Sequence, residues 1–164
     1  MSSGGIALSA MEFLTYRVID ADLHVEPLTA LLFARSEEDT QWQVRVTLCD
    51  ITVDNGIYIV PVHVGMRLLK LREFEEKQEA EPYVTTNVTV AGVFRFSQGN
   101  DWSDALRDKM LRNQAPAIVF PFVRATIGTL LNNAGFGSVV VPLMNMNTIA
   151  ENHPPVNIID AVTN

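Results

Sequence analysis

Apolar and polar residues alternate with period two in four stretches before residue 100, which predicts four β-strands that each bury one face. In the stretch from Ile19 to Val25, odd positions are apolar and the even positions from Asp20 to Glu26 are polar and largely acidic. Upstream, Leu14, Tyr16 and Val18 place the apolar set on even positions. A shift of one residue moves every side chain to the other face, so a bulge is expected near Val18 and Ile19.

The second and third stretches are predicted to form an antiparallel hairpin. The second strand begins at Trp42 and changes phase near Ile51, and the third runs from Tyr58 to Leu68. Asn55-Gly56 lies between them, and this pair readily adopts the positive φ angles of a two-residue hairpin turn. The fourth strand runs from Val84 to Phe96 and follows a charged connection over residues 72–82.

After residue 100 the apolar period becomes helical. Asp101 or Ser103 can cap a short helix to about Asn113, and Pro116 is expected to break or kink it. A second helix with a broad apolar face then runs to Asn132-Asn133 and stops at Gly135, with Pro121 expected near its first turn. Residues 138–141 are expected to pack as an extended segment.

These elements predict an α+β fold: a four-stranded antiparallel sheet with a proline-kinked helix pair packed on one face. With 164 residues, of which 48% are hydrophobic and 19% charged, the chain can bury a sizeable core and is expected to form a single domain over 1–164. Residues 1–12 and 152–164 are expected to be loosely ordered tails.

Charge and cysteine content narrow the classes of function. A net charge of −7 argues against nucleic acid or an anionic membrane surface as a partner. Cys49 is the single cysteine, which excludes an intrachain disulfide and favours a reducing compartment. Residues 1–12 have no secretory pattern and no stretch approaches about 18 uninterrupted apolar residues, so a cytoplasmic protein without membrane insertion is expected.

No motif for catalysis or cofactor binding is present. Gly135-Phe136-Gly137 starts like a dinucleotide fingerprint, but Val140 replaces the third glycine and the segment follows a helix. There is no Walker-type glycine loop, and His24, His63 and His153 lie far apart without metal-ligand spacing. The chain is therefore predicted not to be an enzyme and to need neither cofactor nor metal.

The order of elements resembles the SecB family of cytosolic export chaperones over roughly residues 13–150. The most specific part is Val119-Phe120-Pro121-Phe122-Val123-Arg124, which is similar to the family's Leu-Phe-Pro-Tyr-x-Arg signature and is preceded by Pro116. Gly135-Phe136 is similar to the family's stop after this helix. Weaker matches are Trp42, Gly92-Val93-Phe94, and Pro142 with Asn145.

The resemblance implies a homotetramer, a dimer of dimers, that binds unfolded polypeptides in apolar grooves without ATP and keeps them competent for translocation. Aromatic and methionine surfaces suit this role because they accept apolar side chains with little sequence preference. The alternative is that the same residues are ordinary core. The candidate client-binding residues are Leu32, Phe33, Trp42, Phe120, Phe122, Phe136, Met144 and Met146.

The resemblance also implies that Asp22 and Glu26, on the polar face of the first strand, bind the export motor SecA. The chain departs from the family pattern at Thr85 and Asn87, where the family has a leucine and a glutamate. Three alternatives stay open: a charged strand face that discourages aggregation, a SecB-like chaperone dedicated to one client such as an antitoxin, and a small α+β ligand-binding domain.

Overall fold

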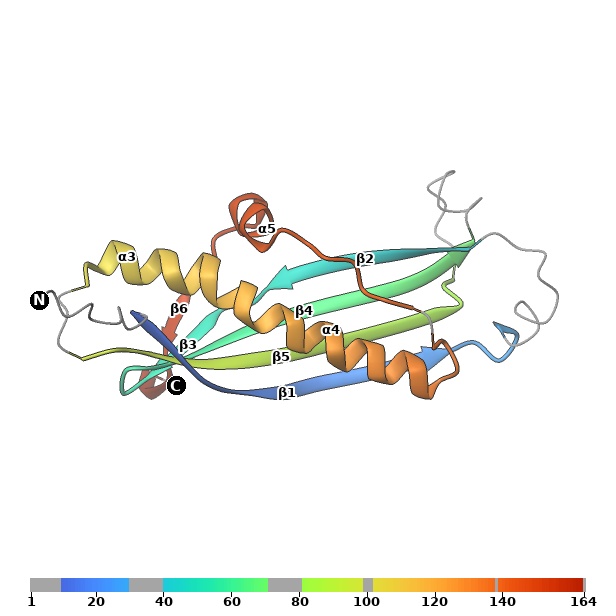
Figure 1. The fold of residues 1–164 in the computed structure, drawn as a ribbon, viewed down its shortest axis with the longest axis horizontal. Helices are drawn as coiled ribbons and strands as arrows, with labels where there is room; N and C mark the ends of the chain where they lie inside the picture. Colours follow the sequence, from blue (N-terminus) through green and yellow to red (C-terminus); the bar gives the residue numbers. More distant parts are fainter. Residues whose placement is uncertain (1–9, 30–39, 71–80, 99–101, 138, 164) are drawn as a thin grey trace, which may run out of the picture.

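The computed structural model describes residues 10–29, 40–70, 81–98, 102–137 and 139–163. A long, mainly antiparallel sheet carries a helix diagonally across one face (Figure 1). The strands are β1 (Met11–Val25), β2 (Thr40–Leu48), β3 (Ile51–Asp54), β4 (Ile57–Lys70), β5 (Val84–Phe96) and β6 (Ile158–Asp160). The helices are α3 (Asp104–Lys109), the π-helical turn η1 (Met110–Gln114), α4 (Ala115–Asn133), α5 (Met146–Asn152) and the 3-10 turn η2 (Ala161–Thr163).

The strand order is β1-β5-β4-β3-β6, with β2 also paired to β4. The predicted α+β class is confirmed, with six strands among the described residues instead of the four predicted. The second predicted strand divides into β2 and β3, and β6 joins the sheet. The predicted Asn55-Gly56 turn is confirmed by φ angles of 48° and 75°. The predicted bulge is confirmed too, since the register of β1 against β5 shifts between Val18 and Asp20.

The helical region departs from the prediction around its prolines. Ser103 caps α3 by accepting a hydrogen bond from the Leu106 amide at 3.3 Å. Pro116 does not end the helix: the amide of Ala115 donates to the carbonyl of Met110, five residues back, and this π-type turn leads directly into α4. Pro121 lies inside α4 and not in its first turn. By length and composition the stretch Asp104–Asn133 could span a membrane, but its apolar stripe is packed on the sheet.

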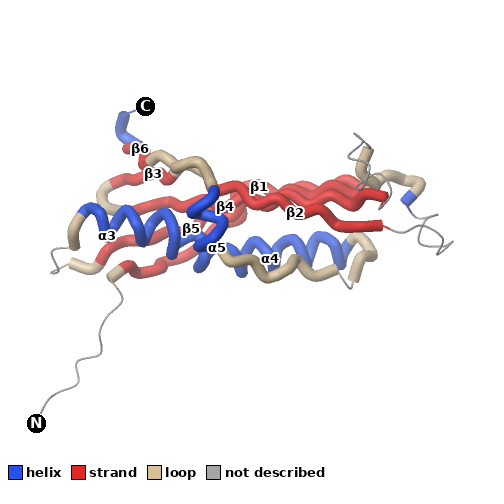
Figure 2. Tube along the Cα trace, turned by 90° about the horizontal axis from the view of Figure 1, so that it is seen from above, coloured by secondary structure: helices blue, strands red, loops and turns tan. Residues whose placement is uncertain are grey.

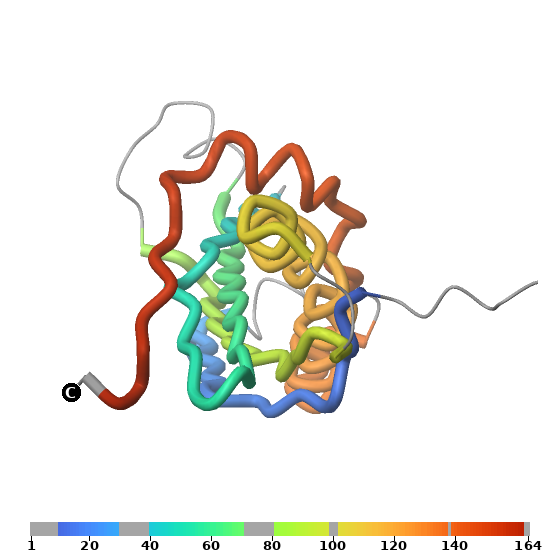
Figure 3. Tube along the Cα trace, turned by 90° about the vertical axis from the view of Figure 1, so that its left-hand side faces the viewer, coloured from blue at the N-terminus to red at the C-terminus, as the bar shows by residue number. Residues whose placement is uncertain are grey.

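The core lies between α4 and one face of the sheet (Figures 2 and 3). Val119, Val123, Ile127 and Leu131 follow each other along α4 and are fully buried. They face the even positions of β5 and β4, where the predicted alternation puts the apolar side chains. The odd positions of β4 and β5 form the opposite face of the sheet, which is polar around His63, Asn87 and Thr89 and apolar towards Ile59 and Val93.

Both predicted tails are corrected where the structure describes them. Met11 is buried and pairs with Phe96, and Glu12 forms a 2.7 Å ion pair with Arg95, so β1 starts inside the expected tail. At the other end Ile158–Asp160 form β6, which runs parallel to β3. The Ile51 amide donates to the Asn157 carbonyl at 2.8 Å and supports this pairing. Residues 1–9 and 164 lie outside the described part of the chain.

Candidate polypeptide-binding site

Trp42 and Phe136 form an aromatic pair between the start of β2 and the segment after α4. Their ring centroids lie 6.3 Å apart with the planes at 87°, an edge-to-face geometry that aromatic rings favour. Both side chains are half-buried against the core, so part of each residue remains accessible to water. We call this the Trp42–Phe136 pair.

The end of α4 determines where Phe136 lies. Gly135 adopts a φ of 93°, and the Phe136 amide donates to the Leu131 carbonyl at 2.8 Å, which is the pattern of a glycine-terminated helix. This turn reverses the chain and directs Phe136 towards β2. The predicted glycine stop therefore also positions a candidate binding residue.

The segment after this turn runs back along α4 and is held there by the signature arginine. Arg124 donates from Nε to the Val141 carbonyl at 3.0 Å. Val141 is buried, whereas Val140 and Leu143 are 73% and 83% exposed. A pocket of about 320 Å³ between the helix and this segment is lined mainly by apolar atoms of Pro121, Gly128 and residues 139–141. Apolar side chains thus remain accessible to water along this segment.

The other predicted client-binding residues differ in their solvent exposure and in their position on the sheet. Phe120 and Met146 are each only 4% exposed, so they belong to the core and are corrected as contact residues in this chain. Phe122 stacks on Tyr16 of β1 with ring centroids 4.1 Å apart, so it faces the opposite edge of the sheet from Trp42. Met144 is half-buried against the core. Leu32 and Phe33 lie outside the described residues.

Sequence reasoning missed an exposed apolar strip on β1. Tyr16, Val18 and Ile19 are 39%, 45% and 58% exposed, although alternation suggested that the apolar set would be covered. β1 is an edge strand that pairs with β5 on one side, and α4 covers little of it. The change of phase at Val18 and Ile19 was the available signal, because it puts two adjacent apolar residues in a strand where only one can face the core.

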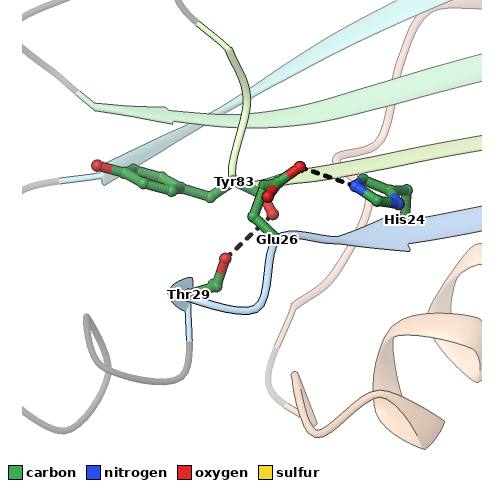
Figure 4. A network of polar contacts seen from close by, with 4 residues as sticks. All are labelled: His24, Glu26, Thr29 and Tyr83. Atoms are coloured by element: carbon green, nitrogen blue, oxygen red, sulfur yellow. Dashed lines mark hydrogen bonds and ion pairs between the residues drawn. The ribbon is translucent and has the colours of Figure 1, made fainter.

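The side chains of Asp22 and Glu26, the two predicted SecA-binding residues, both interact with other residues of this chain. Asp22 accepts hydrogen bonds at Oδ1 from the Asn87 amide and from Asn87 Nδ2, at 3.2 and 3.1 Å. Glu26 Oε1 lies 2.9 Å from His24 Nε2 (Figure 4). The backbone around Glu26 is anchored as well, since the Glu26 amide and the Thr29 hydroxyl both donate to the Tyr83 carbonyl (Figure 4).

The described residues offer little for catalysis. They contain no group of three or more His, Cys, Asp or Glu side chains that could hold a metal ion. Burial, and secondarily the neighbouring Asp50 carboxylate, raises the pKa of the Cys49 thiol, which lowers the thiolate fraction at neutral pH. On the exposed surface, the Arg95 guanidinium hydrogen-bonded to Glu12 lowers the pKa of that carboxyl.

The fold and site define a small α+β domain with a helix packed on one face of its sheet, open edge strands and a half-buried aromatic pair. Residues 11–153 match the family model described as preprotein translocase subunit SecB, so the chain belongs to the SecB family. The resemblance read from the sequence is thereby confirmed.

Two known proteins illustrate the relationship. The protein-export protein SecB of Alkalilimnicola ehrlichii is 33% identical over 73 residues, which span 44% of this chain and 37% of that protein. A SecB-like chaperone of Mycobacterium tuberculosis, solved in complex with a peptide from the HigA1 antitoxin, superposes with a TM-score of 0.60 at 10% identity. That match covers 82% of this chain and 91% of the other, and it shows a shared fold.

Proposed function

We propose that this protein is an ATP-independent chaperone of the cytoplasm that binds unfolded polypeptides and keeps them soluble and competent for export. The observation that carries the proposal is the Trp42–Phe136 pair, which remains half-exposed beside an apolar segment. Unfolded chains present apolar side chains and unpaired backbone, and such a surface accepts them without demanding a sequence. Membership of the SecB family supports the same function.

Suppression of aggregation tests this function directly. The purified protein, without nucleotide, is mixed with a chemically denatured reporter enzyme, and light scattering is followed as the denaturant is diluted. We expect scattering to be suppressed at near-stoichiometric ratios. Unchanged scattering at a large molar excess would contradict the proposal.

We propose that the chain assembles as a dimer of dimers and that the exposed strip on β1 forms one of its two interfaces. An open edge strand with apolar side chains at Tyr16, Val18 and Ile19 invites pairing with a second copy. Val18→Lys is therefore expected to shift the protein to smaller species in sedimentation velocity, because it places a charge in the interface. Thr85→Lys, on the polar face of β5, is the matched control and should leave the assembly intact. Equal sedimentation of Val18→Lys and the unmodified protein would exclude this edge.

A second candidate function is a SecB-like chaperone dedicated to one client, such as an antitoxin. The observation that favours it is the pair of hydrogen bonds from Asn87 to Asp22, which leaves less of that carboxylate available to a motor protein such as SecA. A pull-down from the native cytoplasm separates the candidates. Recovery of SecA with many precursors supports the export role through Asp22 and Glu26, whereas one abundant partner supports the dedicated role.

A further inference from the structure

We propose that the free edge of β2 pairs with the backbone of an extended client segment. The inference rests on the proposed function and specifies how the client is held. β2 pairs with β4 along one side only, and within the described part of the chain no backbone group pairs with its other side.

The direction of the β2 backbone groups follows from two hydrogen bonds. The Cys49 amide donates to the Pro61 carbonyl and therefore points to β4, whereas the Leu48 amide donates to His153 Nε2 at 3.2 Å and points away. Because backbone groups alternate along an antiparallel strand, the amides and carbonyls of Trp42, Val44 and Val46 also point away from β4. These three residues thus present a row of donors and acceptors to an added strand.

The side chains of the same three residues lie on the helix face of the sheet. They are opposite Leu68, Met66 and Val64 and are half-buried against the core. An added strand would therefore place every second side chain beside Trp42, Val44 and Val46, close to the Trp42–Phe136 pair. The favoured client segment is extended, about five residues long, and apolar at alternate positions.

The chain itself already uses the remainder of this edge. Beyond Leu48, β6 pairs with β3 through Ile158 and Ile159, and the Asn157 amide donates to Asp50 Oδ1 at 2.8 Å. His153 marks the boundary: Nε2 accepts from Leu48, so Nδ1 carries the proton that is donated to the Pro154 carbonyl at 2.7 Å. One half of the edge thus holds an apolar strand of the same chain, and the other half is open beside the aromatic pair.

Backbone methylation of a model client tests the inference. A fluorescein-labelled heptapeptide with leucine or phenylalanine at every second position is titrated with the full-length protein, and binding is followed by anisotropy. Two further peptides carry N-methyl groups, one at its apolar positions and one at its polar positions. Each pattern removes the amide donors from a different edge of the extended peptide.

We expect one methylated pattern to bind at least about tenfold more weakly and the other to bind within about twofold of the parent peptide. Loss with the apolar pattern indicates antiparallel addition, and loss with the polar pattern indicates parallel addition. Equal affinities for the two methylated peptides overturn the inference while leaving the proposed chaperone function standing. Absence of binding by the parent peptide overturns the inference, whereas the chaperone function is decided by the aggregation assay.

A pair of variants provides an independent test on the protein side. Val44→Pro removes an outward amide donor without removing a bond to β4, whereas Val44→Ala shortens the side chain and keeps the donor. We expect Val44→Pro to bind the parent peptide at least about threefold more weakly than Val44→Ala. Equal affinities in two folded variants count against strand addition, and the methylated peptides still decide the question if Val44→Pro does not fold.

Discussion

Gly92→Ala is expected to destabilise the protein by about 1–3 kcal/mol and to lower its melting temperature by roughly 3–10 °C. Gly92 is buried in β5, where α4 crosses the sheet. A Cβ atom there would lie 2.4 Å from Cγ2 of Val119 and 2.6 Å from Cε2 of Phe94. Both neighbours are fully buried, so the helix must move away from the sheet or both side chains must leave their preferred rotamers. Urea and thermal unfolding followed by circular dichroism measure the loss.

Gly128→Ala is the matched control because it adds the same methyl group to α4. Apart from its chain neighbours and the backbone of its own helix, no atom lies within 4 Å of the position that its Cβ would take. Alanine favours the helix by up to about 1 kcal/mol. It is expected to leave stability unchanged or slightly raised. Val119→Ala should cost less in the Gly92→Ala background than alone, since it removes the clashing methyl groups. Equal stability of Gly92→Ala and the unmodified protein would mean that the helix does not approach the sheet this closely.

Local chemistry made much of the sheet predictable. The Asn55-Gly56 turn requires positive φ angles that few other pairs adopt, and the structure has them. The bulge after Val18 follows from side-chain geometry alone, because two adjacent residues of one strand cannot both face the core. Each feature depends on residues that are neighbours in the sequence, so it can be predicted without the tertiary structure.

β6 and the helical junction at Pro116 depend on distant or non-standard pairing. Ile158–Asp160 are too short to alternate visibly, and their partner β3 lies a hundred residues earlier in the chain. The turn at Met110–Gln114 keeps the helix continuous by a five-residue hydrogen bond, which propensity rules do not anticipate next to proline. These elements form because the pairing of β6 with β3 and the π-type hydrogen bond satisfy backbone donors and acceptors whose partners cannot be predicted from local sequence.

Only part of the candidate site could be predicted, because the burial of each residue depends on tertiary contacts. The resemblance to the SecB family indicated Trp42 and Phe136, the latter directly after the glycine stop, and the structure brings them into contact. Phe120 and Met146 have the same apolar character but are buried. The sequence pattern shows which face of a helix is apolar. It does not show which of these apolar residues other parts of the chain will bury. Here the bond from Arg124 to Val141 holds the segment after α4 on the helix.

Trp42→Ala is expected to abolish aggregation suppression at equimolar ratio and to weaken binding of an unfolded client by about 10- to 100-fold. Tryptophan residues at binding sites typically contribute about 1–3 kcal/mol, and this ring is the largest half-exposed apolar group of the pair. Phe136→Ala should act in the same direction. The double variant should lose less than the sum of the single losses, because the two rings form one contact surface. Anisotropy titration with a labelled unfolded client measures the affinities.

Tyr58→Ala is the control that separates binding from stability. Tyr58 packs edge-to-face on Phe96 with centroids 5.6 Å apart and planes at 87°, nearly the geometry of the Trp42–Phe136 pair, but at the other end of β4. Its truncation should cost a similar amount of folding free energy and leave client binding within about twofold. If Tyr58→Ala impaired the client affinity as strongly as Trp42→Ala, the loss would follow from a weakened fold. A loss confined to Trp42 and Phe136 would locate client binding at the junction of β2 and the segment after α4.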